Sequence, residues 1–378
     1  MAAQYIETTI GMTRQDIPEA VWSFYDPNGT LASSEHPEDA LLSWLDSKRQ
    51  KPLELPHIGA VATRQLVAME LAHIGVITPE NTKQHSDWLD LRPDDIEQVT
   101  EAAQAYAEQT AHFCLSAVSR IRHQHGLGTR DGSDITLSGA VLSANAHRGQ
   151  TRVVGNRPYY SHPRAVALLL RSAFDNHLAD TSDPSLPIYE FKGLLHDGFE
   201  DEIPRDGSSF LSATNLLVSP LVIAETLKRI GIEDATAWRI PLGMLALVKT
   251  VGFNKEKMAY PKYIERFQHY AEEIPVKLAD LQHNYRIDSK SPDLIDPSKN
   301  HKLYMKREEY YQAQQALLQF YSNSDQITGD DWLQKQLFAA NLLKLNHDDL
   351  ENAMRRTKWA QIAPNELVEY FEGEQQTA

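Results

Sequence analysis

The stretch FKGLLHDGFEDEI, residues 191–203, places a dense group of titratable side chains directly after an apolar run. Leu194 and Leu195 precede His196 and Asp197, and three more acidic residues follow by position 202. Such a pattern has two interpretations: a solvated helix end, or a metal site at the inner end of a buried helix. The stretch alone favours the solvated end, so the choice depends on the rest of the chain.

The composition is that of a globular protein. The chain has 378 residues, of which 42% are hydrophobic and 24% charged, enough for two or three domains with a sizeable core. No apolar run reaches the length of a membrane span, and the N-terminus lacks the basic and apolar regions of a secretory signal. The single cysteine, Cys114, excludes an internal disulfide framework and a multi-cysteine zinc site. We therefore expect a cytoplasmic protein without a membrane partner.

The net charge excludes one class of partner. At −15, with an isoelectric point near 5.4, the protein repels phosphate backbones, and no basic run offsets this charge. Nucleic acid is therefore not an expected partner. A small anionic substrate stays compatible with the charge, because a bound metal ion can invert the local potential. The sequence leaves self-association open.

Helical patterns dominate the chain and predict an all-α fold. Residues 92–126 begin with Pro93 and paired acids and end with Gly126, and their apolar positions recur at helical spacing. Loop-favouring residues at 126–134 and 321–331 interrupt the pattern. We therefore expect an N-terminal helical region over 1–126, a central domain over 134–320 and a C-terminal helical appendage over 321–378.

Three further segments of the central region carry histidines, acids or basic residues: residues 144–155 (ANAHRGQTRVVG), 157–173 (RPYYSHPRAVALLLRSA) and 273–288 (EIPVKLADLQHNYRID). His162 precedes Pro163, which is a residue suited to the start of a helix. Asp280 lies inside an apolar helical pattern, where a buried acid needs a partner or a cation. Helical spacing places Lys277 and Asn284 on the same face as Asp280.

Two histidines and two aspartates form a mixed nitrogen and oxygen donor set. Such a set suits Mn²⁺, Fe²⁺ or Zn²⁺ better than Ca²⁺. An ion held in this way lowers the pKa of bound water and polarises a phosphoryl oxygen. If residues 196–201 continue the preceding helix, Glu200 lies one turn beyond His196, where its carboxylate could orient or deprotonate that water.

The four segments resemble the HD-domain metal-dependent phosphohydrolases, whose H…HD…D pattern matches His162, the pair His196–Asp197 and the distant Asp280. Within that superfamily, AHRGQTR, RPYYSHPRAVA, LLHDGFEDE and VKLADLQHNYR are similar to the hydrolase domain of the Rel/Spo alarmone enzymes and of stand-alone small alarmone hydrolases. The resemblance covers residues 134–310. It implies a helical bundle of the HD type, with further helical regions at both ends.

The resemblance also implies residue roles. One divalent ion, usually Mn²⁺, with Fe²⁺, Zn²⁺ or Mg²⁺ as alternatives, would be bound by His162, His196, Asp197 and Asp280. Glu200 and Asp201 match the acidic pair that activates and orients the attacking water. The candidates for substrate contacts are Arg148, Arg152, Lys277, Asn284 and Arg286. Of these, Arg148 and Arg152 fit surface ion pairs equally well. His147 and His283 are interpreted as structural or supporting groups rather than ligands.

Two departures from the family pattern affect the expected substrate. Val153 and Val154 stand where the family has a basic pair that holds the guanine base, and Leu-Gln replaces Arg-Leu after Asp280. These changes leave the metal chemistry intact and weaken the case for guanosine specificity. We expect an enzyme that releases pyrophosphate from the 3′ position of (p)ppGpp-type alarmones, without synthetase activity. The alternatives are an HD phosphohydrolase for another nucleotide (a nucleoside mono- or triphosphate, or a phosphorylated dinucleotide) and a non-catalytic nucleotide sensor.

Overall fold

The computed structural model describes residues 95–128, 133–152, 157–177, 185–198, 218–247, 250–251, 256–257, 260–284, 300–323 and 338–377. The chain forms two compact units. The first unit contains residues 1–114 and 198–258, and the second contains residues 115–197 and 259–378. The division predicted at 126–134 and near 321 stays a prediction.

The first unit is described mainly by helices. It contains the N-terminal part of α6 (Asp95–His125), together with α10 (Pro220–Ile230), α11 (Asp234–Met244), η3 (Leu245–Leu247), β1 (Thr250–Val251) and β2 (Glu256–Lys257). The two short strands pair in antiparallel fashion. Helix α10 begins where the Ser219 hydroxyl accepts a hydrogen bond from the Val222 N–H, and it ends at Gly231, whose φ of 101° suits glycine. Helix α10 packs against α11.

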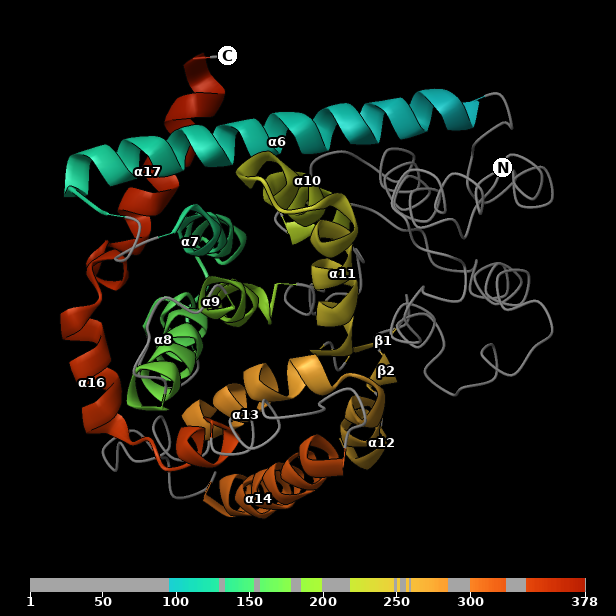
Figure 1. Ribbon diagram of the computed structural model, residues 1–378, viewed down its shortest axis with the longest axis vertical. Coiled ribbons are helices and arrows are strands. Elements are labelled where there is room, and N and C mark those ends of the chain that lie inside the picture. Colours follow the sequence, from blue (N-terminus) through green and yellow to red (C-terminus); the bar gives the residue numbers. More distant parts are fainter. Residues whose placement is uncertain are drawn as a thin grey trace. The chain divides into compact units, whose positions relative to one another are not determined.

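The second unit contains the C-terminal part of α6 and most of the other described helices (Figure 1). These are α7 (Asp134–Ala146), α8 (Ser161–His177), α9 (Leu186–Leu195), α12 (Tyr260–Glu265), η4 (Arg266–His269), η5 (Ala271–Glu273), α13 (Ile274–Gln282), α14 (Asn300–Asn323), α16 (His347–Arg356), η10 (Lys358–Gln361) and α17 (Pro364–Thr377). Apolar residues of α8, α9, α13, α14 and α17 contribute to the core, α7 is buried over nearly its whole length, and α16 contributes no buried residue.

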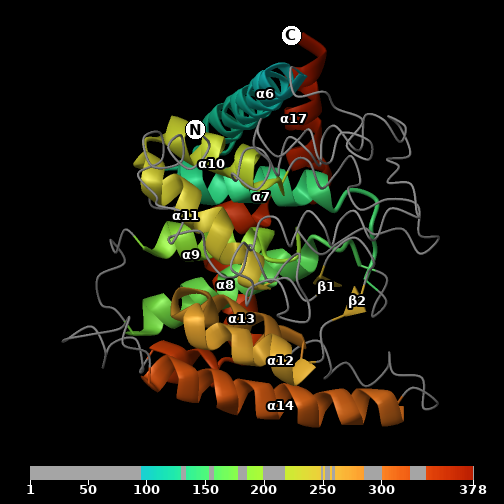
Figure 2. The ribbon, with the colours of Figure 1, turned by 90° about the vertical axis from the view of Figure 1, so that its right-hand side faces the viewer.

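Helices α8, α9 and α13 form the centre of the second unit. Helix α13 packs against both α8 and α9, and it contacts α14 with its other side (Figure 2). Helix α7 covers α9, while α16 and α17 pack on α8 and α7, respectively. Gly193 of α9 faces α8 so closely that a Cβ atom there would lie 2.9 Å from Leu170 Cδ1 and 3.1 Å from the Ala167 backbone. This glycine therefore permits the close approach of α8 and α9.

Buried ion pairs link the helices around α9. Glu190 of α9 is fully buried, and both of its carboxylate oxygens accept hydrogen bonds from Arg171 of α8, at 2.5 and 3.1 Å. The Thr136 hydroxyl of α7 donates a third bond to the same carboxylate at 2.8 Å. A second buried ion pair joins Lys192 of α9 to Glu273 of η5. Because an unpartnered buried charge is costly, these pairs favour one arrangement of α7, α8 and α9.

The predicted all-α class is confirmed for the described residues, with the β1–β2 pair as a small exception. Helix α6 lies inside the predicted range 92–126, and Gly126 follows it with a φ of 58°. None of the helices in the described ranges is both long and apolar enough to cross a membrane.

Candidate metal centre

His162 lies in the first turn of α8. Ser161 begins this helix, and Pro163 occupies a position where no intrahelical N–H donor is needed. The His162 side chain is buried, and its Nε2 atom lies 3.1 Å from Asp280 Oδ1. The start of α8 thus directs an imidazole toward α13.

His196 directly follows the last residue of α9. Its Nδ1 atom donates a hydrogen bond to the Gly193 carbonyl at 2.7 Å, so Nε2 is the nitrogen that can bind an ion once it is deprotonated. The buried Nε2 atom lies 3.1 Å from Asp197 Oδ1 and 3.7 Å from Asp280 Oδ1, and it makes a well-formed hydrogen bond with none of the described residues. A buried, unbonded nitrogen of this kind fits a metal ligand.

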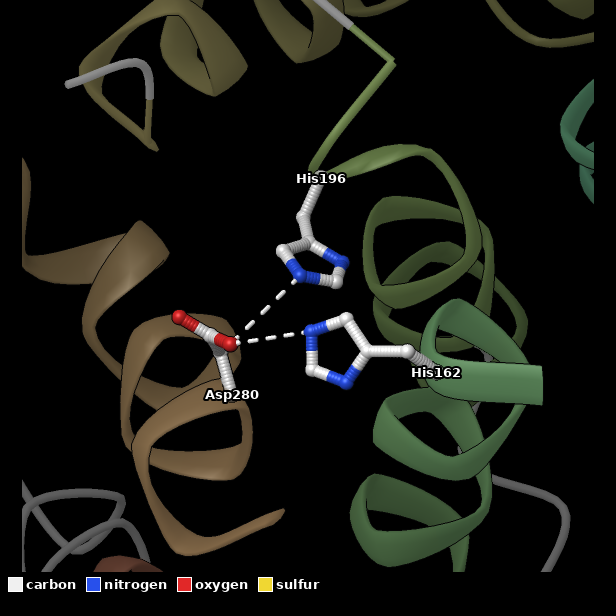
Figure 3. Close-up of side chains that lie close together, drawn as sticks. All are labelled: His162, His196 and Asp280. Carbon is white, nitrogen blue, oxygen red and sulfur yellow. Dashed lines mark ion pairs between the residues drawn. The ribbon is translucent and has the colours of Figure 1, made fainter. Parts of the chain in front are cut away.

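Asp280 lies on the inner face of α13 and holds both carboxylate oxygens in defined contacts. Lys277 Nζ lies 2.7 Å from Oδ2, and Asn284 Nδ2 donates to Oδ1 at 2.5 Å. Figure 3 shows the two imidazoles converging on this carboxylate from different elements. One ligand atom from each of His162, His196 and Asp280 lies within 4.8 Å of the others, and all three residues are buried. The described part of the chain thus contains a cluster that can hold one divalent ion.

Asp197 lies beside the cluster, with its Oδ1 atom 3.1 Å from His196 Nε2 and its Oδ2 atom 3.4 Å from His162 Nε2. The Tyr159 hydroxyl donates a hydrogen bond to Oδ2 at 3.0 Å, which orients the carboxylate. This position is compatible with the predicted role of Asp197 as a fourth ligand. The resulting set of nitrogen and oxygen donors suits a first-row transition metal ion.

The electrostatics of the centre are those of two carboxylates facing two imidazoles. Burial opposes the charged form of His196, but Asp197 and Asp280 outweigh it and raise the pKa of His196 to about 10. Burial likewise disfavours ionised Asp280, yet Lys277 and the two histidines hold its pKa well below the usual range. The pKa of Asp197 is lowered because the charge of His196 overcomes the effect of burial. Both carboxylates are therefore ionised at neutral pH and available to a cation.

His162 differs from His196 in its charge. Burial lowers the pKa of His162, although hydrogen bonding to Asp280 opposes this shift. Its Nδ1 atom lies 2.8 Å from Nδ1 of His283, whose pKa is also lowered by burial. The two rings are therefore neutral at pH 7, the form in which imidazole binds metal ions.

Residues 196–198 do not continue α9, which is the condition under which Glu200 would lie one helical turn beyond His196. Helix α9 ends at Leu195, and residues 196–198 form a turn that reaches Gly198, a residue that disfavours helix. Glu200, Asp201 and Arg286 lie outside the described residues, so their predicted roles stay predictions.

The remaining predicted contact residues fall into two groups. Arg148 is exposed and forms an ion pair with Glu372 of α17, one of the two possibilities that the sequence left open. Arg152, by contrast, donates a hydrogen bond to Asn284 Oδ1 at 3.0 Å, and Asn284 in turn donates to Asp280. Lys277 and Asn284 thus contact the ligand candidate Asp280 directly, while Arg152 is linked to Asp280 only through its hydrogen bond to Asn284.

Sequence reasoning missed two parts of this arrangement. Tyr159 received no role, because nothing in its spacing shows that its hydroxyl reaches Asp197. Gly193 was also missed, since its function lies in a backbone carbonyl and in the absence of a side chain. The one available signal was position: Gly193 precedes His196 by three residues, the distance at which a histidine after a helix can reach a carbonyl of the last turn.

Comparison of the chain with known protein families, with curated proteins and with solved structures finds no significant match. The case for a function therefore rests on the sequence segments and on the geometry of the centre.

Proposed function

We propose that the protein is a metal-dependent phosphohydrolase that acts on a nucleotide, with (p)ppGpp-type alarmones as the first candidate substrates. The observation that carries this proposal is the buried convergence of His162, His196 and Asp280 from three separate segments. The same three segments, together with residues 144–155, carry the resemblance to HD-domain alarmone hydrolases. A bound divalent ion would lower the pKa of a water molecule and withdraw charge from a phosphoryl oxygen.

The residues of this chain would supply the positions for that chemistry. Two ionised carboxylates and the Nε2 atoms of two imidazoles form the ion site, and the Gly193 carbonyl holds the other ring proton of His196 on Nδ1. In this proposal Glu200 and Asp201 orient and deprotonate the attacking water. Arg286 contacts the substrate phosphates, and hydrolysis releases pyrophosphate from the 3′ position.

A second candidate is a phosphohydrolase for another nucleotide, and one structural observation favours keeping it. Leu281 stands where the resembling family has arginine, and its side chain is packed in the core. The adjacent Gln282 is also buried and donates hydrogen bonds to the carbonyls of Leu343 and Leu345 at 3.1 and 2.6 Å. Neither residue offers a positive charge to a substrate. A nucleotide sensor without turnover is the third candidate.

The test is phosphate and pyrophosphate release from ppGpp and from a panel of nucleoside mono- and triphosphates and phosphorylated dinucleotides in the presence of Mn²⁺. A His196→Ala, Asp197→Ala double variant serves as the inactive control. We expect pyrophosphate release from ppGpp that the double variant abolishes. Turnover of another nucleotide but not of ppGpp would show that the substrate differs from the first candidate, while the proposed reaction class would stand. Binding of a nucleotide without turnover of any panel member would favour the sensor.

A further inference from the structure

His283 is a buried histidine that contacts a ligand candidate without facing the cluster itself. It directly follows α13, and its backbone N–H donates to the carbonyls of Ala279 and Asp280. Its ring lies against that of His162, with centroids 4.8 Å apart and the two Nδ1 atoms 2.8 Å apart. At 5% exposure, it is shielded from water. Asp280 and His283, three residues apart, thus contact opposite nitrogens of the His162 ring: Asp280 lies beside Nε2 and His283 beside Nδ1.

The contact between the two Nδ1 atoms has a strict chemical consequence. A hydrogen bond between two nitrogens needs one proton and one lone pair, so one ring donates and the other accepts. If His283 donates, the proton of neutral His162 lies on Nε2, where it blocks an ion and points at Asp280 Oδ1 at 3.1 Å. If His283 accepts, the proton lies on His162 Nδ1, and the Nε2 lone pair is free for an ion.

We propose that His283 is a positioning residue whose Nδ1 accepts a hydrogen bond from the Nδ1–H of His162 and thereby fixes the tautomer in which His162 binds a metal ion. This inference rests on the metal centre of the proposed function. In both histidines of the centre an Nδ1–H then donates a hydrogen bond, in His162 to His283 and in His196 to the Gly193 carbonyl. Outer partners of this kind orient metal-binding imidazoles and raise their basicity.

The test compares two replacements of His283 in the full-length chain. In His283→Asn the amide oxygen occupies nearly the place of Nδ1 and still accepts a hydrogen bond, whereas His283→Leu has a similar volume and no acceptor. Zn²⁺ and Mn²⁺ affinities are measured by competition with a chelator. We expect His283→Leu to bind about 10- to 100-fold more weakly and His283→Asn to stay within about threefold of the parent.

A control and a spectroscopic readout separate positioning from a structural role. His125→Leu removes a histidine that pairs with Glu366 at 2.7 Å, away from the cluster, and should leave metal affinity unchanged. In ¹⁵N-histidine-labelled protein loaded with Zn²⁺, a scalar coupling between the two Nδ1 atoms should report the hydrogen bond directly. We expect that coupling in the parent and its loss in both His283 variants.

Three results would overturn the inference: equal weakening of both His283 variants, parental affinity in His283→Leu, or the absence of the coupling in the Zn²⁺-loaded parent. If His283→Leu does not fold, His283→Asn and the coupling in the parent still decide the matter. An active site that binds Zn²⁺ or Mn²⁺ but hydrolyses no nucleotide would reject the proposed function and leave the role of His283 standing. A parent chain that binds neither ion would reject both.

Discussion

Each ligand candidate of the centre is held by a partner of its own. Asp280 contacts Lys277 and Asn284, His196 bonds to the Gly193 carbonyl, and His162 bonds to His283. Helical spacing places Lys277 and Asn284 on the face of Asp280, so contacts with Asp280 agree with the pattern, whereas the predicted role of both residues in substrate binding stays a prediction. His283 was expected as a structural or supporting group without a named partner, because it is far from His162 in sequence, and the Gly193 carbonyl was not assigned, because it is a backbone atom.

Replacing Lys277 should destabilise the protein strongly. Its ammonium group is the main counter-charge of buried Asp280, and removing one partner of a buried ion pair leaves the other uncompensated. We expect Lys277→Met to lower the free energy of unfolding by about 3 kcal/mol in urea titrations of the metal-free protein. Lys262→Met, at an exposed lysine of α12, is the matched control and should change it by less than about 0.5 kcal/mol. An equal loss in both variants would contradict this account of the pair.

Metal binding should release a proton. The pKa of His196 is raised to about 10, so in the metal-free protein at neutral pH both ring nitrogens carry a proton and the ring is positively charged. An ion competes with that proton, and the affinity must therefore rise with pH until the pH exceeds the raised pKa. We expect a gain of about tenfold per pH unit between about pH 7 and 8.5.

Calorimetric titration with Zn²⁺ in buffers of different ionisation enthalpy measures this effect. At pH 7.5 about one proton per ion should be transferred to the buffer. A heat of binding that does not depend on the buffer, together with an affinity that does not change with pH, would show that His196 is already neutral in the metal-free protein.

At the scale of elements, the centre depends on how closely α9 approaches α8. The helices themselves could be predicted, because their apolar residues recur at helical spacing. A helix end near His196 was expected as well, but its last residue could not be predicted, since a histidine and an acid before Gly198 fit a continuing helix as well as a turn. The close contact of α8 with Gly193 could not be predicted either, because residue spacing does not show which helix lies opposite a glycine.

Gly193→Ala should therefore damage both packing and metal binding. The added Cβ would lie 2.9 Å from Leu170 Cδ1 and 3.1 Å from the Ala167 backbone, so α9 must move and carry the Gly193 carbonyl and His196 with it. We expect a loss of about 1–3 kcal/mol in the free energy of unfolding, measured in urea, and weaker Zn²⁺ binding.

Gly373→Ala in α17 is the matched control, because a Cβ atom there would come no closer than 3.7 Å to the end of the Arg120 side chain. Alanine favours helix over glycine, so this variant should keep or gain stability, by up to about 1 kcal/mol. If Gly193→Ala behaves in the same way as Gly373→Ala, the close approach of α8 and α9 is not required.

At the scale of the whole molecule, residues far apart in sequence meet at one point. The sequence predicted which residues converge, through the order of four segments, and it predicted the all-α class of the described residues. It could not predict that α16 packs on α8 and α17 on α7, because these contacts depend on the path of the chain rather than on any local pattern. The centre joins residue 162 to residue 280, so a bound ion should stabilise the folded chain as a whole.

Thermal unfolding measures that stabilisation. An ion present at 100 times its dissociation constant adds about 2.7 kcal/mol to the stability of the state that binds it. We expect Mn²⁺ to raise the melting temperature of the parent and EDTA to reverse the shift. Asp280→Asn, which lacks the carboxylate charge between the two histidines, should show no such response. A similar shift in this variant would place the ion elsewhere.

The stoichiometry of Mn²⁺ binding tests the central claim most directly. Paramagnetic resonance of the free ion during titration of the full-length chain gives the number of ions bound and their affinity. The account predicts about one tightly bound ion per chain in the parent and in His125→Ala, and its loss in both His162→Ala and Asp280→Ala. If the parent takes up no Mn²⁺, or if the ligand variants bind it as the parent does, then the buried cluster is not a metal centre.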